Sequence, residues 1–129
     1  MAMESKAADD RPIDEARSLV PAAALFQSLS DPARLALLQH LALGEHRVVD
    51  LQEHLGLAQS TVSAHLACLR DCGLVTSRPQ GRASMFSLAA GPELMAVLGA
   101  AERLLAATGD AVELCPRHGR HAPAEDVDR

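Results

Sequence analysis

The spacing of apolar positions predicts helices across the first third of the chain. From Ile13 to Leu29 the apolar residues recur at helical spacing, with an interruption at Pro21. Because proline ends one helix and suits the first turn of the next, two short helices are expected to meet there. A further helix is expected to start at the Ser-Asp-Pro run of residues 30–32, where a capping residue precedes a proline, and to end at Gly44.

Two short helices in the middle of the chain predict a helix-turn-helix. The first covers residues 48–55 and is closed by Gly56. The second opens within residues 57–60 and ends at Gly73, and its inward-facing positions are Val62, Leu66 and Leu69. A glycine-bearing turn between two helices of this size is typical of DNA-binding proteins, in which the second helix enters the major groove.

A β-hairpin is predicted directly after this recognition helix. Residues 74–78 and 83–88 have the composition of strands, and the Pro-Gln-Gly-Arg run between them is rich in turn residues. A hairpin in this position is a wing. The predicted fold class is therefore mainly α with a small β-hairpin, a winged helix-turn-helix.

A last long helix is expected to start at the Gly-Pro pair of residues 91–92. Its stripe is more apolar than a small monomer easily covers, so it predicts a homodimer interface. The stripe consists of Leu94, Val97, Leu98, Ala101, Leu104 and Leu105. The chain is thus divided into a disordered arm (1–12), a winged helix-turn-helix domain with dimerisation helices (13–108) and a polar tail (109–129).

The charge distribution bears on DNA binding. The net charge of −5 argues against a DNA-binding protein, but residues 31–88 carry five arginines and five carboxylates and are neutral. The acidic excess lies in the two ends of the chain. A neutral module binds DNA if its arginines converge on one face.

Composition limits the class of protein further. The chain has no Trp, no Tyr and only two Phe, so its core is built from Ala, Leu and Val, which favours packed helices. No apolar run approaches the ~20 residues of a membrane span. The acidic N-terminus, broken by Pro12, is unlike a signal peptide. We therefore expect a cytoplasmic protein without a membrane partner, whose cysteines stay reduced.

Three cysteines carry the candidate chemistry. Cys68 and Cys72 lie four residues apart near the end of the recognition helix, which places both thiols on one helix face. Cys115 lies in the polar tail, near His118 and His121, and is the candidate third ligand; the two histidines are optional ligands. Thiolates favour cadmium, lead and mercury, and zinc also accepts them. The alternative is that Cys68 and Cys72 are merely small buried apolar residues.

The start of the recognition helix and the wing supply the candidate DNA contacts. Side chains at the start of such a helix point at base edges, and wing arginines hold phosphate or enter the minor groove. The candidates are Gln59, Ser60, Thr61, Ser63, His65, Arg78 and Arg82. Helix capping is an alternative role for Ser60 and Thr61. His40, His46 and His54 are expected to lie on solvated faces without a specific role.

Several of these motifs, in this order, resemble the ArsR/SmtB family of metal-responsive bacterial repressors. The resemblance spans about residues 25–105. It rests on residues 29–35 (Leu-Ser-Asp-Pro-Ala-Arg-Leu), residues 55–66 (Leu-Gly-Leu-Ala-Gln-Ser-Thr-Val-Ser-Ala-His-Leu), residues 73–75 (Gly-Leu-Val) and the Gly81-Arg82 turn. It implies a winged-helix homodimer that binds operator double-stranded DNA when metal-free and releases it when an inducer ion binds.

Within that family, the Cys68 and Cys72 pair with a tail cysteine resembles the cadmium- and lead-sensing CmtR branch. The resemblance implies that Cys115 bridges to the recognition helix of the other subunit. The Cys-x-Cys pair of arsenic sensors is absent, since residues 48–50 are Val-Val-Asp, and the last helix lacks the histidines of zinc, nickel and cobalt sensors. Cadmium or lead is the expected inducer, although zinc, mercury and arsenite also suit three thiolates.

Three other functions stay open at this point. Cysteines four residues apart on a helix are within reach of a disulfide, so the same fold can serve as a thiol redox sensor. A metal-buffering protein that never binds DNA fits the acidic balance and the His/Cys tail, but it leaves the helix-turn-helix and the wing unexplained. An enzyme is disfavoured, since the cysteines have no evident general base and the chain lacks a phosphate-binding glycine loop.

Overall fold

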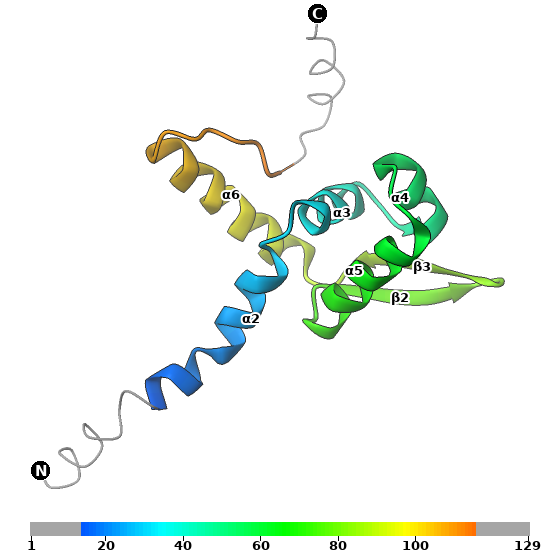
Figure 1. Ribbon diagram of the computed structural model, residues 1–129, viewed down its shortest axis with the longest axis horizontal. Coiled ribbons are helices and arrows are strands. Elements are labelled where there is room, and N and C mark those ends of the chain that lie inside the picture. Colours follow the sequence, from blue (N-terminus) through cyan, green and yellow to red (C-terminus); the bar gives the residue numbers. More distant parts are fainter. Residues whose placement is uncertain (1–13, 116–129) are drawn as a thin grey trace, which may run out of the picture.

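The computed structural model describes residues 14–115 (Figure 1). The predicted arm of residues 1–12 and the histidines at 118 and 121 therefore lie outside the described residues. After a helical stretch over residues 14–18, the elements are α2 (Val20–Ser28), α3 (Pro32–Ala42), β1 (His46–Arg47), α4 (Val48–Leu55), α5 (Gln59–Asp71), β2 (Val75–Gln80), β3 (Ala83–Leu88) and α6 (Gly91–Ala107).

The helices begin where local chemistry predicts them. A turn at Leu19 separates the first helical stretch from α2, whose first turn contains Pro21. Asp31 caps α3, because its carboxylate accepts hydrogen bonds from the backbone N–H groups of Ala33 (2.7 Å) and Arg34 (3.4 Å). The bond from Ala33 is the largest of the effects that lower the pKa of this carboxyl.

Glycines end the two helices of the helix-turn-helix. Gly56 follows α4 with a φ of 67°, in the left-handed region that other residues rarely adopt. At the end of α5, Gly73 donates to the carbonyl of Arg70 and Leu74 donates to that of Leu69, both at 2.9 Å. These two bonds form a Schellman motif, which satisfies the last carbonyls of the recognition helix. Both predicted helix ends are confirmed.

The sheet has three strands, one more than the predicted hairpin, in the order β1-β3-β2. β1 pairs antiparallel with β3, with His46 opposite Phe86. The sequence predicted no strand at His46 and Arg47, because two residues are too few to show an alternating pattern. The wing turn is also shorter than predicted, since β2 continues through Pro79 to Gln80. β2 is an edge strand, where proline is tolerated.

The core lies where α3, α4, α5, β3 and α6 meet. Its buried side chains are Leu37, Leu38, Leu41, Leu51, Val62, Leu66, Leu69, Val75, Phe86, Leu94 and Leu98. Val62, Leu66 and Leu69 confirm the predicted inward face of α5. Figure 1 shows the β2–β3 wing projecting from this core on the side away from α6. Among residues 14–115, no helix combines the length and apolar character needed to cross a membrane.

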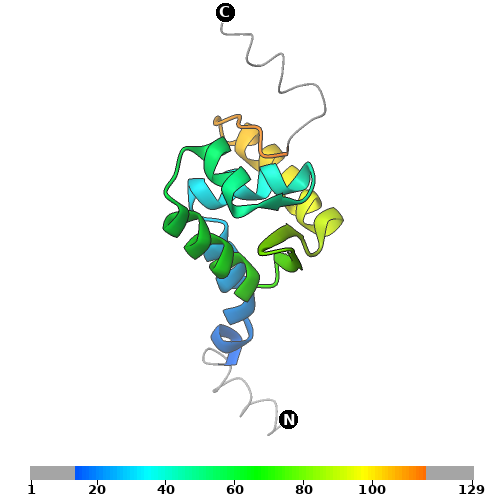
Figure 2. The same cartoon turned by 90° about the vertical axis from the view of Figure 1, so that its right-hand side faces the viewer.

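Helix α2 and one side of α6 carry large apolar side chains that the rest of this chain does not cover. Leu19, Val20 and Phe26 are 60–61% exposed, and Leu104 on α6 is 65% exposed. Figures 1 and 2 show α2 extending away from the core. A groove of about 150 Å³ between Leu25 of α2 and the first turns of α6 adds to this apolar surface. The predicted interface stripe on α6 is therefore only partly uncovered, because Leu94 and Leu98 are buried in the core of this chain, and the apolar surface continues on α2 instead.

Candidate metal and nucleic-acid site

The first turn of α5 presents polar side chains to solvent. Gln59, Ser60, Thr61 and Ser63 are all exposed. The residue that precedes α5 in the capping position is Ala58, and no side chain caps the helix. Helix capping, the alternative role considered for Ser60 and Thr61, is therefore absent. These four side chains form a polar face at the end of the helix that should approach DNA bases.

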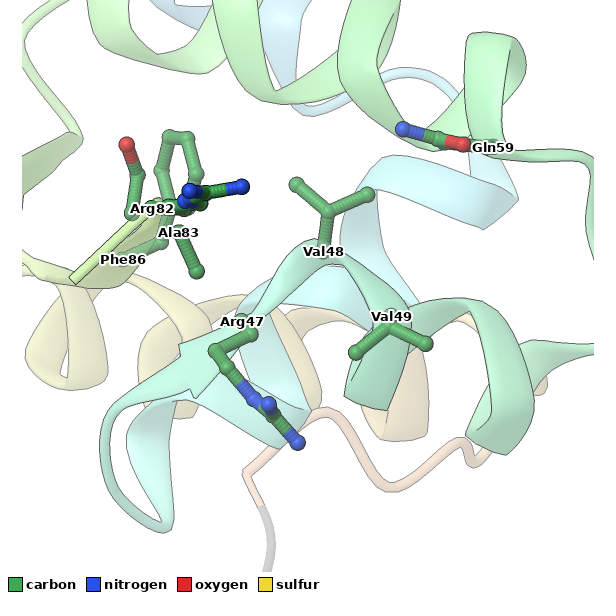
Figure 3. A pocket seen from close by; sticks show the side chains of 8 residues that line it. Arg47, Val48, Val49, Gln59, Arg82, Ala83 and Phe86 are labelled. Atoms are coloured by element: carbon green, nitrogen blue, oxygen red, sulfur yellow. The ribbon is translucent and has the colours of Figure 1, made fainter. Parts of the chain in front are cut away.

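A groove of about 390 Å³ runs from this face to the wing (Figure 3). Gln59 lies on one side of it and Arg82 of the wing turn on the other, while the start of α4 forms its floor. The full lining consists of Arg47, Val48, Val49, Gln59, Arg82, Ala83, Ser84 and Phe86. The groove thus joins two of the predicted DNA contacts, and it adds Arg47 and Ser84, which the sequence did not single out.

The two arginines of this groove differ in whether a carboxylate is paired with them. Arg47 is paired with Asp50, with an Nη2 to Oδ1 distance of 3.1 Å, and the Asp50 carboxylate also accepts the backbone N–H of Arg47. In the described part of the chain, Arg82 has no carboxylate partner. Arg82 is therefore the arginine of the groove whose charge no described carboxylate neutralises.

The other wing arginine, Arg78, is held in a two-bond ion pair. Its Nε and Nη2 atoms donate to the two carboxylate oxygens of Glu45, at 2.9 and 2.8 Å. These hydrogen bonds are the main reason that the pKa of Glu45 is lowered and the pKa of Arg78 is raised. A phosphate at Arg78 would have to compete with Glu45, a partner that no sequence pattern indicated because it is 33 residues away.

His65 is half-buried and is less open to solvent than the first turn of α5. Its Nδ1 lies 3.3 Å from Nη1 of Arg34 on α3. Arg34 in turn donates from Nε to the carbonyl of Ser28 (2.7 Å) and from Nη2 to the carbonyl of Gln27 (3.0 Å). One arginine thus connects the recognition helix to the last residues of α2.

The Cys68 and Cys72 pair lies at the other end of the recognition helix. Cys68 is half-buried in the last turn, and Cys72 is the first residue after α5, with its backbone N–H donating to the carbonyl of Cys68 at 3.1 Å. The Cys72 thiol contacts the hydroxyl of Ser28 at 2.6 Å. Ser28 is only 2% exposed, although it is polar. This buried serine, which no sequence pattern singled out, is one contact between the predicted ligand pair and α2, and the carbonyl of Ala24, 4.0 Å from the same thiol, is another.

Cys115 lies against a different part of the molecule. Its backbone N–H and that of Leu114 both donate to Oε2 of Glu102 on α6, each at 2.6 Å, and its thiol donates to the carbonyl of Met95 at 3.6 Å. Gln39 of α3 donates to the carbonyl of Leu114 at 3.0 Å. The start of the predicted polar tail is therefore docked on α3 and α6.

The structure keeps Cys68 and Cys72 together but does not bring Cys115 to them. All three are thiols rather than disulfides. Across residues 14–115, no three side chains of His, Cys, Asp or Glu form a group that would hold a metal ion as they stand. A site with three thiolates therefore requires movement of the tail or a contribution from a second subunit.

Comparison with known proteins places the chain in a family. Residues 31–77 match the arsR family of bacterial regulatory proteins. The HTH-type transcriptional regulator CmtR of Mycobacterium tuberculosis is 42% identical over 106 residues, covering 71% of this chain and 88% of CmtR. The chain belongs to the ArsR family. This membership confirms the resemblance indicated by the sequence motifs.

Two further comparisons agree with this family. A probable mercury resistance operon repressor of Streptomyces lividans is 38% identical over 95 residues, covering 74% of this chain and 75% of that protein. The homodimeric winged helix-turn-helix DNA-binding domain Mb0332 of Mycobacterium bovis, solved by NMR, has a TM-score of 0.62 and 30% identity, covering 70% of this chain and 88% of that domain. The winged helix-turn-helix fold predicted from the sequence is confirmed.

The Glu45 and Arg78 pair gives a pH-dependent prediction. A lowered folded pKa means that the pair stabilises the fold above the ordinary carboxyl pKa of 4.5 and that this contribution is lost as the pH falls through the folded value. In Arg78→Gln, the carboxyl of Glu45 should titrate at a higher pH than in the unmodified protein, as followed by NMR of the side-chain carboxyl carbon.

Asp31 is the internal control for this titration. Its pKa is lowered chiefly by the backbone N–H of Ala33, so Arg78→Gln should leave its midpoint unchanged. If Glu45 titrates at the same pH with and without Arg78, the ion pair does not form in solution.

Proposed function

We propose that this chain is a metal-responsive transcriptional repressor that binds operator double-stranded DNA as a metal-free homodimer. It is released when Cys68, Cys72 and Cys115 bind a thiophilic ion, with cadmium or lead as the first candidates. The observation that carries the proposal is the position of Cys68 and Cys72. They lie at the end of the recognition helix, where Cys72 contacts the buried Ser28 of α2.

The chemistry of the pair favours soft ions. Sulfur ligands select soft and borderline metals over magnesium, calcium or manganese, so cadmium, lead, mercury and zinc all suit thiolates. The CmtR likeness favours cadmium or lead among them. Because thiols must lose their protons to ligate, metal binding releases protons and weakens as the pH falls.

The third ligand of this site is Cys115 from a tail that changes position or belongs to the partner subunit. From Thr108 at the end of α6, seven residues of extended chain reach at most about 23 Å. Within one subunit, Cys115 contacts Met95 of α6 while Cys72 contacts α2. The histidines at 118 and 121 follow Cys115 closely in sequence and are optional further ligands.

Metal capture would reach the DNA-reading surface through Ser28 and Arg34. A metal at Cys72 takes its sulfur away from the hydroxyl of Ser28, whose carbonyl holds Arg34, which contacts His65 on α5. Disturbing this chain of contacts changes how α5 is held against α2 and α3. Release of DNA requires a coupling free energy of only about 1–3 kcal/mol between the two sites.

The second subunit of the homodimer would cover α2 and α6. Their exposed apolar side chains, Leu19, Val20, Phe26, Val97 and Leu104, form a surface that a single small chain leaves in water. The likeness to the homodimeric domain Mb0332 supports this assembly. A dimer would place two recognition helices on two half-sites of the operator, about one helical turn apart.

The proposed DNA contacts form two groups. Gln59, Ser60, Thr61 and Ser63 face the base edges, and Arg82 holds the sugar-phosphate backbone along the groove that it shares with Gln59. Arg78 joins this surface only by leaving Glu45. His65 acts mainly by holding α5 to Arg34, so we assign it a positioning role.

The metal site is tested by titrating the reduced protein with cadmium. Thiolate-to-cadmium charge transfer should appear in the ultraviolet, should weaken strongly in Cys68→Ser or Cys72→Ser, and should weaken in part in Cys115→Ser. In a mobility-shift assay, cadmium should release operator DNA from the unmodified protein and fail to release it from Cys68→Ser. The serine variants should bind operator normally without metal, which controls for folding.

Cadmium release that survives in Cys68→Ser contradicts the proposed site. Equal absorption with and without Cys115 confines the site to the recognition helix. If the reduced protein shows no such absorption, the redox-sensing alternative replaces metal sensing, and peroxide followed by mass spectrometry of the thiols then tests it.

The DNA surface is tested with arginine variants. Arg82→Ala should weaken operator binding and should reduce the slope of log affinity against log salt concentration by about one, because one phosphate contact is lost. Arg103→Ala, an exposed arginine on α6 outside the groove, is the matched control and should leave the slope unchanged. Equal slopes for the two variants would remove Arg82 from the DNA contacts.

The dimer surface is tested with two equally exposed residues. Phe26 on α2 and Leu43 after α3 are both 61% exposed. Sedimentation velocity should show that Phe26→Asp is a monomer, because a carboxylate would be buried without a partner in the interface. Leu43→Asp should stay a dimer. A dimer in both variants would show that α2 is not part of the interface.

A further inference from the structure

Three histidines from three different elements meet on one surface of the domain. His40 lies in the last turn of α3, His46 in β1 and His54 in the last turn of α4. The rings of His40 and His54 stack, with centres 4.8 Å apart and planes 14° apart. The ring of His46 packs edge-on against both, at 5.6 Å from His54 and 6.2 Å from His40.

These histidines were expected to lie on solvated faces, and the structure shows in addition that their rings contact one another. After α3, the chain turns at Gly44, with a φ of 148°, and returns as β1 along β3. This return places His46 beside the last turns of both α3 and α4. The three rings meet because β1 pairs with β3. The sequence did not predict β1, so it gave no indication of this contact.

The separation of the rings fits a shared metal ion. Imidazole nitrogens bind zinc at about 2.0–2.1 Å, so three rings on one tetrahedral ion have centres roughly 5 Å apart. The observed separations of 4.8, 5.6 and 6.2 Å lie close to this value. The ring nitrogens do not yet converge on one point. Binding of an ion would therefore require these side chains to rotate. Such rotations take picoseconds to nanoseconds at a protein surface.

One ring nitrogen of His46 is bonded to the backbone in a way that leaves the other able to bind a metal. Its Nδ1 lies 2.8 Å from the carbonyl oxygen of Gly44. A carbonyl only accepts hydrogen bonds, so Nδ1 must carry the proton, and the lone pair is then on Nε2. Metal-bound histidines commonly make this bond from the second nitrogen to a backbone carbonyl or a carboxylate, which fixes both tautomer and ring orientation.

Two carboxylates close to His46 in sequence are already paired. Asp50 pairs with Arg47 at 3.1 Å, and Glu45 pairs with Arg78 at 2.8 Å. The proposed site therefore depends on the imidazole nitrogens themselves.

We propose that His40, His46 and His54 form a second metal site, which takes a borderline divalent cation such as zinc, nickel, cobalt or copper through imidazole nitrogen alone. Imidazole suits these ions, whereas lead and cadmium favour the thiolates of the first site. An ion bound here links the ends of α3 and α4 to β1. It would therefore stiffen the first helix of the helix-turn-helix against the sheet that carries the wing.

The test uses the full-length chain with Cys68, Cys72 and Cys115 all replaced by serine, so that no thiolate remains. Far-UV circular dichroism first establishes that this chain is folded. Titration with zinc chloride by calorimetry should show one equivalent of zinc per chain. His54→Gln in the same background should lower the affinity at least about 10-fold, since loss of supporting contacts alone has effects of that size.

The matched control is His121→Gln, which removes an imidazole from the tail instead. It should leave the zinc affinity unchanged. If zinc fails to bind the cysteine-free chain, or if His121→Gln lowers the affinity as much as His54→Gln does, the site is not at these three histidines. This result would leave the cadmium titration of the thiols unaffected, so the two sites fail independently.

A second measurement avoids substitution of any histidine. In NMR spectra of the cysteine-free chain, zinc should shift the imidazole signals of His40, His46 and His54 together and should leave those of His65 in place. Shifts confined to other histidines would overturn the proposal, even if the His54 variant proved to be unfolded.

Discussion

Burial of the inner row of α5 is the constraint on which the rest of the molecule depends. Val62, Leu66 and Leu69 are at most 1% exposed and lock the rotation of this helix against the core. With that row fixed inward, the helical period turns Gln59 and Ser63 outward, as base contacts require. Full burial of a Leu or Val side chain contributes about 1.5–3 kcal/mol, so three of them outweigh the capping bond that α5 lacks at Ala58. The face that α5 presents to solvent is therefore set by packing, and this is the face on which the proposed DNA contacts lie.

The same small, aliphatic core leaves apolar surface that the proposed second copy of the chain would cover. With Phe86 as its one large aromatic side chain, the core draws on short aliphatic residues and covers α6 only along Leu94 and Leu98. Helix α2 contributes only Ser28 to the buried set, and that residue is polar. Its stability as a helix must come from tertiary contacts, because nine residues are too few for a stable isolated helix. Helix α2 therefore carries both Ser28, which contacts the Cys72 thiol at the end of α5, and part of the proposed dimer surface, although little of it is buried within a single subunit.

Local signals in the sequence were sufficient to predict the helices. They were not sufficient to predict the contacts between residues that are distant in the sequence. Pro21, Gly56 and Gly73 act through their own backbone conformation, and Asp31 acts through a side-chain cap on neighbouring residues, so the helix boundaries that depend on them were predictable. The partners of the functional side chains were not. Ser28 lies 44 residues from Cys72, and Glu45 lies 33 residues from Arg78, so only the folded chain brings them together. The two-residue strand β1 was not predicted for a related reason, since it forms only by pairing with β3. The candidate ligands and base contacts could be named from the sequence, but not the groups that hold them.

The docked start of the tail shows how Cys115 can serve a site that it does not touch in this chain. Glu102 holds the backbone N–H groups of Leu114 and Cys115 at 2.6 Å, and Gln39 holds the Leu114 carbonyl, so the anchoring acts on the main chain. The Cys115 thiol, by contrast, makes a hydrogen bond of 3.6 Å to Met95, which is weak for sulfur. Exchange of that bond for a metal bond costs little, whereas release of the main chain would leave the Glu102 carboxylate to be solvated again. In the proposed dimer, the recognition helix of one subunit would approach the docked tail of the other, and the Cys115 thiol would turn toward it. The ion would then tie the recognition helix to a main chain that is anchored on α3 and α6, so its effect would fall on the position of the recognition helix.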